Sequence, residues 1–170
     1  MTNLSGRSAI VTGGFSGMGF AIATALAQAG ANVAAGSYIA PAGADRSDAA
    51  YYPGADEIER VRSALSAHGT RVHAAHLDVR DSEVTNLFAA EAEAAIGPAD
   101  ILVNAAGTTA EQPVCGHSDA LWDKIVDTNL TGAFRATRAV LPGMIGRGWG
   151  RIVNIGSTAA SVGWKDNPAY

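Results

Sequence analysis

Residues 10–19 of this chain read IVTGGFSGMG, and the fold follows from this stretch. An apolar strand beginning at Ser8 runs into its glycines, and a helical pattern of apolar residues follows them and stops before Gly30. A glycine-rich turn between a strand and a helix leaves backbone N–H groups unpaired at the positive end of the helix dipole, where they attract a phosphate group. Side chains in place of the glycines would hold a pyrophosphate away and crowd the helix against the strand. We therefore expect this turn to bind a dinucleotide rather than to be a tight turn without a ligand.

Length and composition are those of one soluble domain. The chain has 170 residues, of which 48% are hydrophobic and 16% charged, so it can form a substantial core. The net charge of −4 and the lack of a basic run argue against nucleic acid or an anionic membrane as a partner. Cys115 is the only cysteine, which excludes an internal disulfide, and no run of 18 apolar residues suggests a membrane span. We expect a cytoplasmic protein.

The second strand is expected at residues 31–37, which completes a strand–helix–strand unit with a parallel pair. An acidic residue at the end of this strand usually binds the adenosine ribose hydroxyls of NAD. Here Ser37 takes that place, Tyr38 follows it, and the nearest cation is Arg46 in the next loop. The missing carboxylate removes a group that would repel a 2′-phosphate, but no adjacent arginine attracts one. The position weakly favours NADP and leaves NAD open.

Three further strands are expected, at residues 71–77, 100–103 and 151–155. His73 and His76 lie three apart on the first of them, which places them on opposite faces of a strand. A pair of histidines on opposite faces cannot share a metal ion, so we propose no metal site.

Helices are expected between these strands: Asp56 and Ser82 are predicted to be the N-caps of the first two, and the next helix is expected to start at Ser118 or Asp119. Glu59 stands three residues after Asp56, as in a capping box. Pro142 and the glycines after it are expected to end the last helix. Residues 39–55 are rich in turn formers and read as a long loop, either functional or merely solvated.

Asn129 is a polar residue on an apolar helix face, because it follows Leu121, Trp122 and Ile125 at helical spacing. Its amide either serves a site or bonds to local backbone. The sequence pattern leaves both readings open.

Polar or small residues follow the end of every expected strand, at 12–19, Ser37, Asp78, 104–107 and Ser157. In an open parallel sheet this edge is where ligands bind. We therefore expect an α/β fold with a doubly wound, Rossmann-like parallel sheet in three α/β/α layers.

Several motifs together resemble the short-chain dehydrogenase/reductase family. They are Thr12-Gly13-x-x-x-Gly17-x-Gly19, Asp78-Val79, Asn104-Ala105-Ala106-Gly107, Asn129-Leu130-x-Gly132, the segment 151–157 ending in Ser157, and Tyr170 preceded by Asn167-Pro168-Ala169. The resemblance extends over the whole chain, and the combination is specific although each motif alone is not.

The resemblance implies an NAD- or NADP-binding domain with two groups of site residues. Cofactor contacts are implied for Gly13, Phe15, Ser16, Gly17, Met18, Gly19, Ser37, Asp78, Val79, Asn104, Ala105, Ala106, Gly107 and Tyr170. Three members of a catalytic tetrad are implied: Asn129, Ser157 and Tyr170.

Two departures from the family pattern stand out. Ala105 replaces the usual second asparagine after the fourth strand. The family's tetrad lysine follows its tyrosine by four residues, but this sequence has no position 174. We therefore expect residues 1–170 to be a single dinucleotide-binding domain that is incomplete at its C-terminus; the alternative is a short, catalytically inactive relative.

The implied reaction is hydride transfer between nicotinamide and a carbonyl or secondary alcohol. Tyr170 would act as the acid/base and Ser157 would polarise the substrate oxygen. A 3-oxoacyl thioester and a small alcohol or polyol are both compatible substrates, and the family implies a homotetramer or homodimer. A different class of function, a dinucleotide-binding sensor or assembly protein without chemistry, stays open.

Overall fold

The computed structural model describes residues 3–40 and 54–170, so most of the expected loop at 39–55 lies outside the described residues. One sheet contains five strands: β1 (Ser8–Thr12), β2 (Asn32–Ser37), β3 (Val72–His76), β4 (Ile101–Asn104) and β5 (Arg151–Asn154). Their order is β3-β2-β1-β4-β5, and every neighbouring pair is parallel. This confirms the expected doubly wound parallel sheet, and each strand agrees with its predicted range to within one residue at either end.

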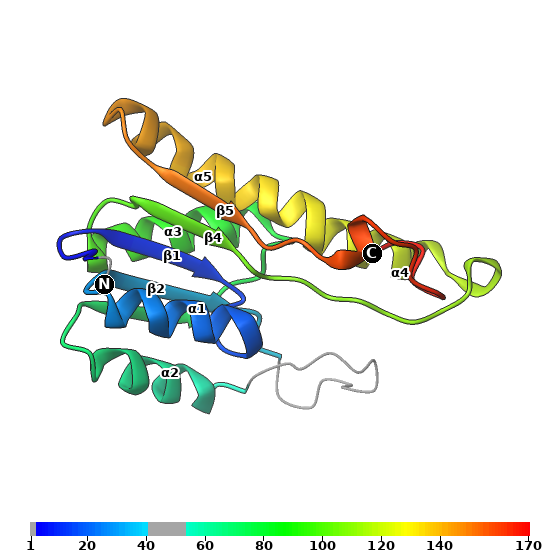
Figure 1. The fold of residues 1–170 in the computed structure, drawn as a ribbon, viewed down its shortest axis with the longest axis horizontal. Coiled ribbons are helices and arrows are strands. Elements are labelled where there is room, and N and C mark those ends of the chain that lie inside the picture. Colours follow the sequence, from blue (N-terminus) through cyan, green and yellow to red (C-terminus); the bar gives the residue numbers. More distant parts are fainter. Residues whose placement is uncertain (1–2, 41–53) are drawn as a thin grey trace.

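Helices cover both faces of the sheet (Figure 1). They are α1 (Gly17–Gln28), α2 (Asp56–Ser66), α3 (Ser82–Ile96), α4 (Asp119–Val126) and α5 (Gly132–Gly146), with short 3-10 turns at Val114–Gly116 and Thr158–Ala160. One apolar cluster lies under α1 and α2, and the other lies under α3 and α5. Alternate residues of β1 belong to the two clusters, Val11 to the first and Ile10 to the second. Both faces of this strand are therefore buried, as its continuous apolar sequence predicts.

The N-cap residues of two helices, α2 and α3, differ from the predictions. Ala55 is the N-cap of α2 and its side chain makes no capping hydrogen bond, so the predicted capping box from Asp56 to Glu59 is wrong. Asp56 instead lies in the first helical turn, where its carboxylate still favours the positive end of the helix dipole. For α3 the cap is Asp81 rather than Ser82, because the Asp81 carboxylate accepts hydrogen bonds from two backbone N–H groups, those of Glu83 and Val84.

Asp81→Ala is expected to lower the free energy of unfolding by about 1 kcal/mol, because it leaves two N–H groups of α3 without their acceptor. The matched control is Ser82→Ala, whose hydroxyl accepts only an exposed bond from Arg138 and whose loss is expected to cost less than about 0.5 kcal/mol. Urea denaturation of both variants measures the difference. A larger loss for Ser82→Ala would contradict the assignment of the cap.

The prediction that Pro142 and the glycines after it end the last helix is right for the glycines but wrong for Pro142, which lies inside α5. Proline lacks the N–H that would bond to the carbonyl of Arg138 one turn earlier. Both residues are exposed, so water can satisfy that carbonyl. The helix ends instead at Gly146, and Gly148 follows with a φ of +64°, the left-handed conformation common after a helix.

The expected long helix from Ser118 is present but interrupted. The Ser118 hydroxyl caps α4 by accepting from the N–H of Leu121. A π-helical turn, Asp127–Thr131, then joins α4 to α5. Such turns often mark functional positions, and this one carries Asn129.

No helix in the described part of the chain is long and apolar enough to cross a membrane.

Candidate cofactor cleft and catalytic residues

The glycine turn between β1 and α1 leaves no room for side chains at two of its positions. A Cβ atom at Gly19 would lie 2.1 Å from the carbonyl oxygen of Gly13. Gly13 itself has a φ of +66°, and a Cβ there would lie 2.8 Å from the backbone of Ala105 and Ala106. The backbone of the turn is therefore packed directly against α1 and against the segment after β4. This close approach is what a turn needs to present its N–H groups to a phosphate.

A cleft of about 360 Å³ opens at the carboxyl ends of the strands. The predicted cofactor residues that line it are Gly13, Ser16, Gly17, Met18, Gly19, Ser37, Asp78, Val79, Ala105, Ala106 and Gly107. Residues that the sequence analysis missed also line it: Tyr38, Leu77, Arg80, Thr108, Thr109, Lys124 and Thr128. The structure thus brings segments after β1, β2, β3 and β4 together around one elongated space.

Three predicted cofactor residues do not line this cleft: Phe15, Asn104 and Tyr170. The Phe15 ring is fully buried in the core, and the Phe15 carbonyl accepts a hydrogen bond of 2.7 Å from Arg60. Asn104 is 6% exposed, and its amide donates to the Asn154 side chain at 2.8 Å and to the Thr137 hydroxyl at 3.3 Å. Phe15 therefore supports the glycine turn from the core, and Asn104 ties β4 to β5 and α5.

Thr12 at the end of β1 has a role that the sequence analysis did not assign. Its side chain is buried, and its hydroxyl accepts hydrogen bonds from the backbone N–H groups of Ala105 and Ala106, at 3.2 and 3.1 Å. These bonds hold the segment after β4 against the glycine turn. The sequence feature that could have indicated this role is the position of Thr12 directly before Gly13 in the glycine motif.

An ion pair stands at the other end of the cleft, where β2 and β3 end. The Arg80 guanidinium donates to both oxygens of Asp78, at 2.9 and 2.8 Å, and its backbone N–H also donates to Asp78. Burial alone would raise the pKa of the Asp78 carboxyl, but the hydrogen bonds and the charge of Arg80 outweigh it and hold the pKa below its ordinary value. The guanidinium also lies 5.2 Å from the centre of the Tyr38 ring. Asp78 is thus an oriented carboxylate at the edge of the cleft.

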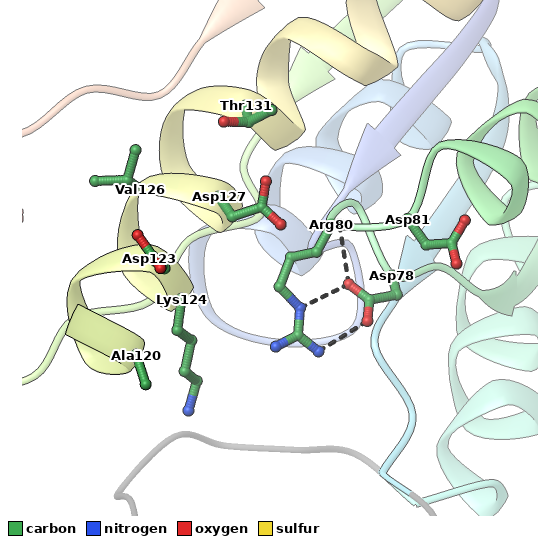
Figure 2. A pocket seen from close by; sticks show the side chains of 9 residues that line it. All are labelled: Asp78, Arg80, Asp81, Ala120, Asp123, Lys124, Val126, Asp127 and Thr131. Carbon is green, nitrogen blue, oxygen red and sulfur yellow. Dashed lines mark hydrogen bonds and ion pairs between the residues drawn. The ribbon is translucent and has the colours of Figure 1, made fainter. Parts of the chain in front are cut away.

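A second hollow of about 590 Å³ adjoins this ion pair and lies between α4 and the segment after β3 (Figure 2). Figure 2 shows the side chains of Lys124 and Arg80 both reaching into it. Asp78, Arg80 and Lys124 line this hollow and the cleft alike. Arg80 could have been found from the sequence, since it directly follows Asp78-Val79; Lys124 could not, because only the packing of α4 brings it here.

Asn129 makes non-local contacts, unlike the local backbone bond that the sequence left open. Its Oδ1 accepts from the N–H of Thr108 at 2.8 Å, and its Nδ2 donates to the Thr108 carbonyl at 2.9 Å. The π-helical turn therefore clamps the peptide backbone of a residue that lines the cleft.

Ser157 and Tyr170 lie on the segment that follows β5, at the same edge of the sheet but outside the residues lining the cleft. The Ser157 hydroxyl accepts from the N–H of Ala159 at 3.1 Å and caps the short helix Thr158–Ala160. The Tyr170 side chain is 44% exposed and packs edge-on against Trp164, with 5.9 Å between ring centres.

Within residues 3–40 and 54–170, no group of three or more His, Cys, Asp or Glu side chains is arranged to hold a metal ion. His73 and His76 have different neighbours, His73 lying near Glu91 and His76 packing on the Tyr38 ring. Burial lowers the pKa of His73; Glu91 opposes this shift and Arg62 adds to it.

A parallel sheet in this order, with a glycine turn after its first strand and a cleft at its carboxyl edge, defines a Rossmann-like nucleotide-binding protein. The sequence model of the family described as short chain dehydrogenase matches residues 7–170. The chain belongs to the short-chain dehydrogenase/reductase family, whose members are NAD(P)-dependent oxidoreductases.

Similar proteins include 2,3-dihydro-2,3-dihydroxybenzoate dehydrogenase of Bacillus subtilis (strain 168), which is 36% identical over 98% of this chain and 58% of its own length. Nodulation protein G of Azospirillum brasilense is 39% identical over 98% of this chain and 62% of its own length. A crystal structure assigned as a short-chain alcohol dehydrogenase of Sinorhizobium meliloti 1021 superimposes with a TM-score of 0.85 at 37% identity, over 99% of this chain and 61% of that one. The chain spans about 60% of the length of these relatives.

Proposed function

We propose that the intact gene product containing this chain is an NAD(P)-dependent oxidoreductase that interconverts a small carbonyl compound and a secondary alcohol. The observation that carries the proposal is the cleft at the carboxyl edge of the sheet, built from the glycine turn and the segment after β4. The segment bearing Ser157 and Tyr170 runs along the same edge. Family membership adds the class of reaction.

The residues present fit a dinucleotide. A Cβ at Gly19 would meet the Gly13 carbonyl, and a Cβ at Gly13 would meet the backbone of Ala105 and Ala106. The Ser16 side chain does not cap α1, so the first N–H groups of α1 are left for a ligand. Asp78 and Val79 would hold the adenine end, and Ala105 to Gly107 the middle of the molecule. When bound, the nicotinamide would supply or accept the hydride.

NADP is the cofactor that we propose in preference to NAD. Ser37 lines the cleft at the ribose position, and it carries no charge to repel a 2′-phosphate. Arg80 and Lys124 add positive charge at the same end of the cleft, although Asp78 neutralises much of the charge of Arg80. Competition between the two cofactors for the cleft measures the preference directly.

Three side chains have proposed catalytic roles. Tyr170 would give a proton to the developing alkoxide during reduction and take it back during oxidation. Ser157 would donate a hydrogen bond to the substrate oxygen as charge develops there. Asn129, whose amide is bonded to the backbone of Thr108, would hold a water molecule in the proton relay. A free phenol has a pKa near 10, so a nearby cation is needed to favour phenolate at neutral pH. In the family this cation is the tetrad lysine four residues after the tyrosine, and the proposal requires such a lysine in the intact gene product.

Substrate choice is proposed to lie in residues 108–117 and 158–168, which flank the site at the edge of the sheet. A 3-oxoacyl thioester and a small alcohol or polyol remain the two proposed classes. Acetoacetyl-CoA reductase of Cupriavidus necator is 35% identical over 92% of this chain, and it suggests a 3-oxoacyl thioester as the first compound to assay.

A homodimer or homotetramer is proposed on the face formed by the π-helical turn and α5. Leu130, Phe134, Leu141 and Ile145 are exposed there at helical spacing, between 36% and 70%. An exposed apolar stripe of this kind is typical of a surface that another copy covers. Sedimentation equilibrium of the intact gene product measures its oligomeric state.

The first experiment on this proposal is the intact mass of the gene product, because residues 1–170 account for 17.3 kDa. A heavier protein then goes into NADPH and NADH oxidation assays with acetoacetyl-CoA, simple ketones and sugar ketones as substrates. Oxidation with any of them supports the proposal. Tight dinucleotide binding without turnover on any of them would favour the sensor function instead.

A further inference from the structure

The segment carrying Tyr170 is fastened at two points to the segment that follows β4, and the two run side by side in Figure 1. The Thr109 hydroxyl is hydrogen-bonded to Oδ1 of Asn167. The backbone N–H of Gln112 donates to the carbonyl of Asp166 at 2.6 Å. Residues 58 apart in the sequence are thereby held together immediately before Tyr170.

Asn167 is the anchored side chain of an otherwise open segment. It is 9% exposed, whereas its neighbours Val162, Trp164 and Tyr170 are between 44% and 63% exposed. The Thr109 hydroxyl supplies the hydrogen bond of Oδ1, whereas Nδ2 is buried with no partner among the described residues. The bond to Thr109 is therefore the side-chain hydrogen bond that offsets part of the cost of burying this amide. Pro168 follows and restricts the backbone between this anchor and Tyr170.

Asp166 has a φ of +57°, the only left-handed residue other than glycine among the described residues. Aspartate tolerates this conformation better than most side chains, but it still costs free energy. The bond from Gln112 to its carbonyl offsets part of that cost. The conformation of the chain just before Tyr170 therefore depends on contacts from the segment after β4.

That segment is itself held from the other side. Asn129 bonds both the N–H and the carbonyl of Thr108, and Thr108 and Thr109 both line the cleft. Asn129 in the π-helical turn is thus hydrogen-bonded to Thr108, and the next residue, Thr109, is hydrogen-bonded to Asn167. Asn167 lies three residues before Tyr170.

We infer that Thr109 is a positioning residue: through its hydrogen bond to Asn167, it fixes Tyr170 relative to Asn129 and the cofactor cleft. The expected effect on kcat rests on the proposed function, whereas the fixed position of the Tyr170 segment rests on the hydrogen bonds described above. Its specific content is that the hydroxyl of Thr109 acts on the reaction through Asn167 and the position of Tyr170.

Thr109→Val is expected to lower kcat of the intact gene product at least tenfold, because small displacements of an acid/base group sharply reduce the rate. Because Thr109 also lines the cleft, kcat is measured at saturating dinucleotide, which separates the positioning of Tyr170 from any change in the Kd for the dinucleotide. Thr109→Ser keeps the hydroxyl and is expected to restore kcat. The matched control is Thr70→Val, which removes a buried hydroxyl that has no partner and lies outside the cleft.

A double variant tests whether the effect passes through Asn167. Thr109→Val combined with Asn167→Leu is expected to lose no more kcat than Thr109→Val alone, since either change breaks the same bond. Additive losses, or a kcat for Thr109→Val within twofold of the unchanged protein, would overturn the inference. Thermal melting of each variant separates a loss of folding from a loss of positioning.

Hydrogen exchange of the backbone at residues 166–170 keeps the inference testable if the unchanged protein shows no turnover. Absence of turnover would count against the proposed function alone. Faster exchange in Thr109→Val, but not in Thr109→Ser or Thr70→Val, would still show that Thr109 holds the Tyr170 segment. Unchanged exchange in Thr109→Val would overturn the inference whatever the activity.

Discussion

Replacing Tyr170 by Phe is expected to lower kcat of the intact gene product by a factor of about 100 or more, with little change in the Kd for the dinucleotide. General acid–base groups typically contribute about 10²- to 10⁴-fold to a rate, and phenylalanine keeps the ring while it removes the hydroxyl. The ring of residue 170 packs edge-on against Trp164, so the variant is expected to keep this contact and the conformation of the segment.

Steady-state oxidation of NADPH at saturating substrate measures the change, and fluorescence titration of the dinucleotide provides the control. A Tyr170→Phe protein that turns over within a few-fold of the unchanged protein would remove Tyr170 from the mechanism. Ser157→Ala is the companion variant, because Ser157 lies on the same segment and has the other proposed catalytic hydroxyl.

The second large effect is expected from Gly19→Ala, which should lower the free energy of unfolding by about 3 kcal/mol and abolish dinucleotide binding. The added Cβ would lie 2.1 Å from the Gly13 carbonyl oxygen and 2.7 Å from its carbon, and neither can move without displacing the turn. Because the turn itself is the proposed phosphate site, any displacement that relieves the clash also changes that site.

Two other glycines provide controls for this variant. Gly17 has a φ of +49° but open space around its Cβ position, so Gly17→Ala is expected to cost only about 1 kcal/mol of backbone strain. Gly163 has neither a positive φ nor any neighbour within 4 Å, so Gly163→Ala is expected to leave stability unchanged to within about 0.5 kcal/mol. Chemical denaturation of the three variants ranks them, and equal stability of Gly19→Ala and Gly163→Ala would contradict the close packing of the turn.

Strand β5 forms one edge of the sheet and is exposed. All four residues of β5 are exposed, and Ile152 and Val153 are apolar. An unpaired apolar edge strand promotes aggregation. Size-exclusion chromatography of each variant beside the unchanged protein separates aggregation through this edge from an effect of the substitution.

Much of the candidate site could be predicted from local sequence alone. The requirement for Gly13 and Gly19 follows from a strand, a tight turn and a helix that are adjacent in the chain, so the packing that excludes a Cβ is local. The carboxyl-edge positions of Ser37, Asp78 and the residues after β4 follow from strand periodicity and the rule that ligands bind at this edge of a parallel sheet. These inferences needed only the order of the elements.

Predictions about the ends and interruptions of helices were less successful. The choice between Asp81 and Ser82 as the cap of α3 depends on one residue of backbone register, which two adjacent capping residues do not specify. Pro142 inside α5 shows tertiary packing and solvent overriding a local signal. The π-helical turn at Asn129 has no sequence signature, since it arises where the helix adjusts to hold Thr108.

By itself, therefore, the sequence determined the parallel sheet, the glycine turn and the family, because each rests on periodicity or on residues that are close in the chain. Only the tertiary structure decided that Phe15 and Asn104 turn away from the cleft, that Arg80 and Lys124 both line it, and that Thr109 bonds to Asn167. The physical reason is that side-chain direction and long-range contact depend on how the helices pack on the sheet. That packing is a property of the whole fold and of no single segment.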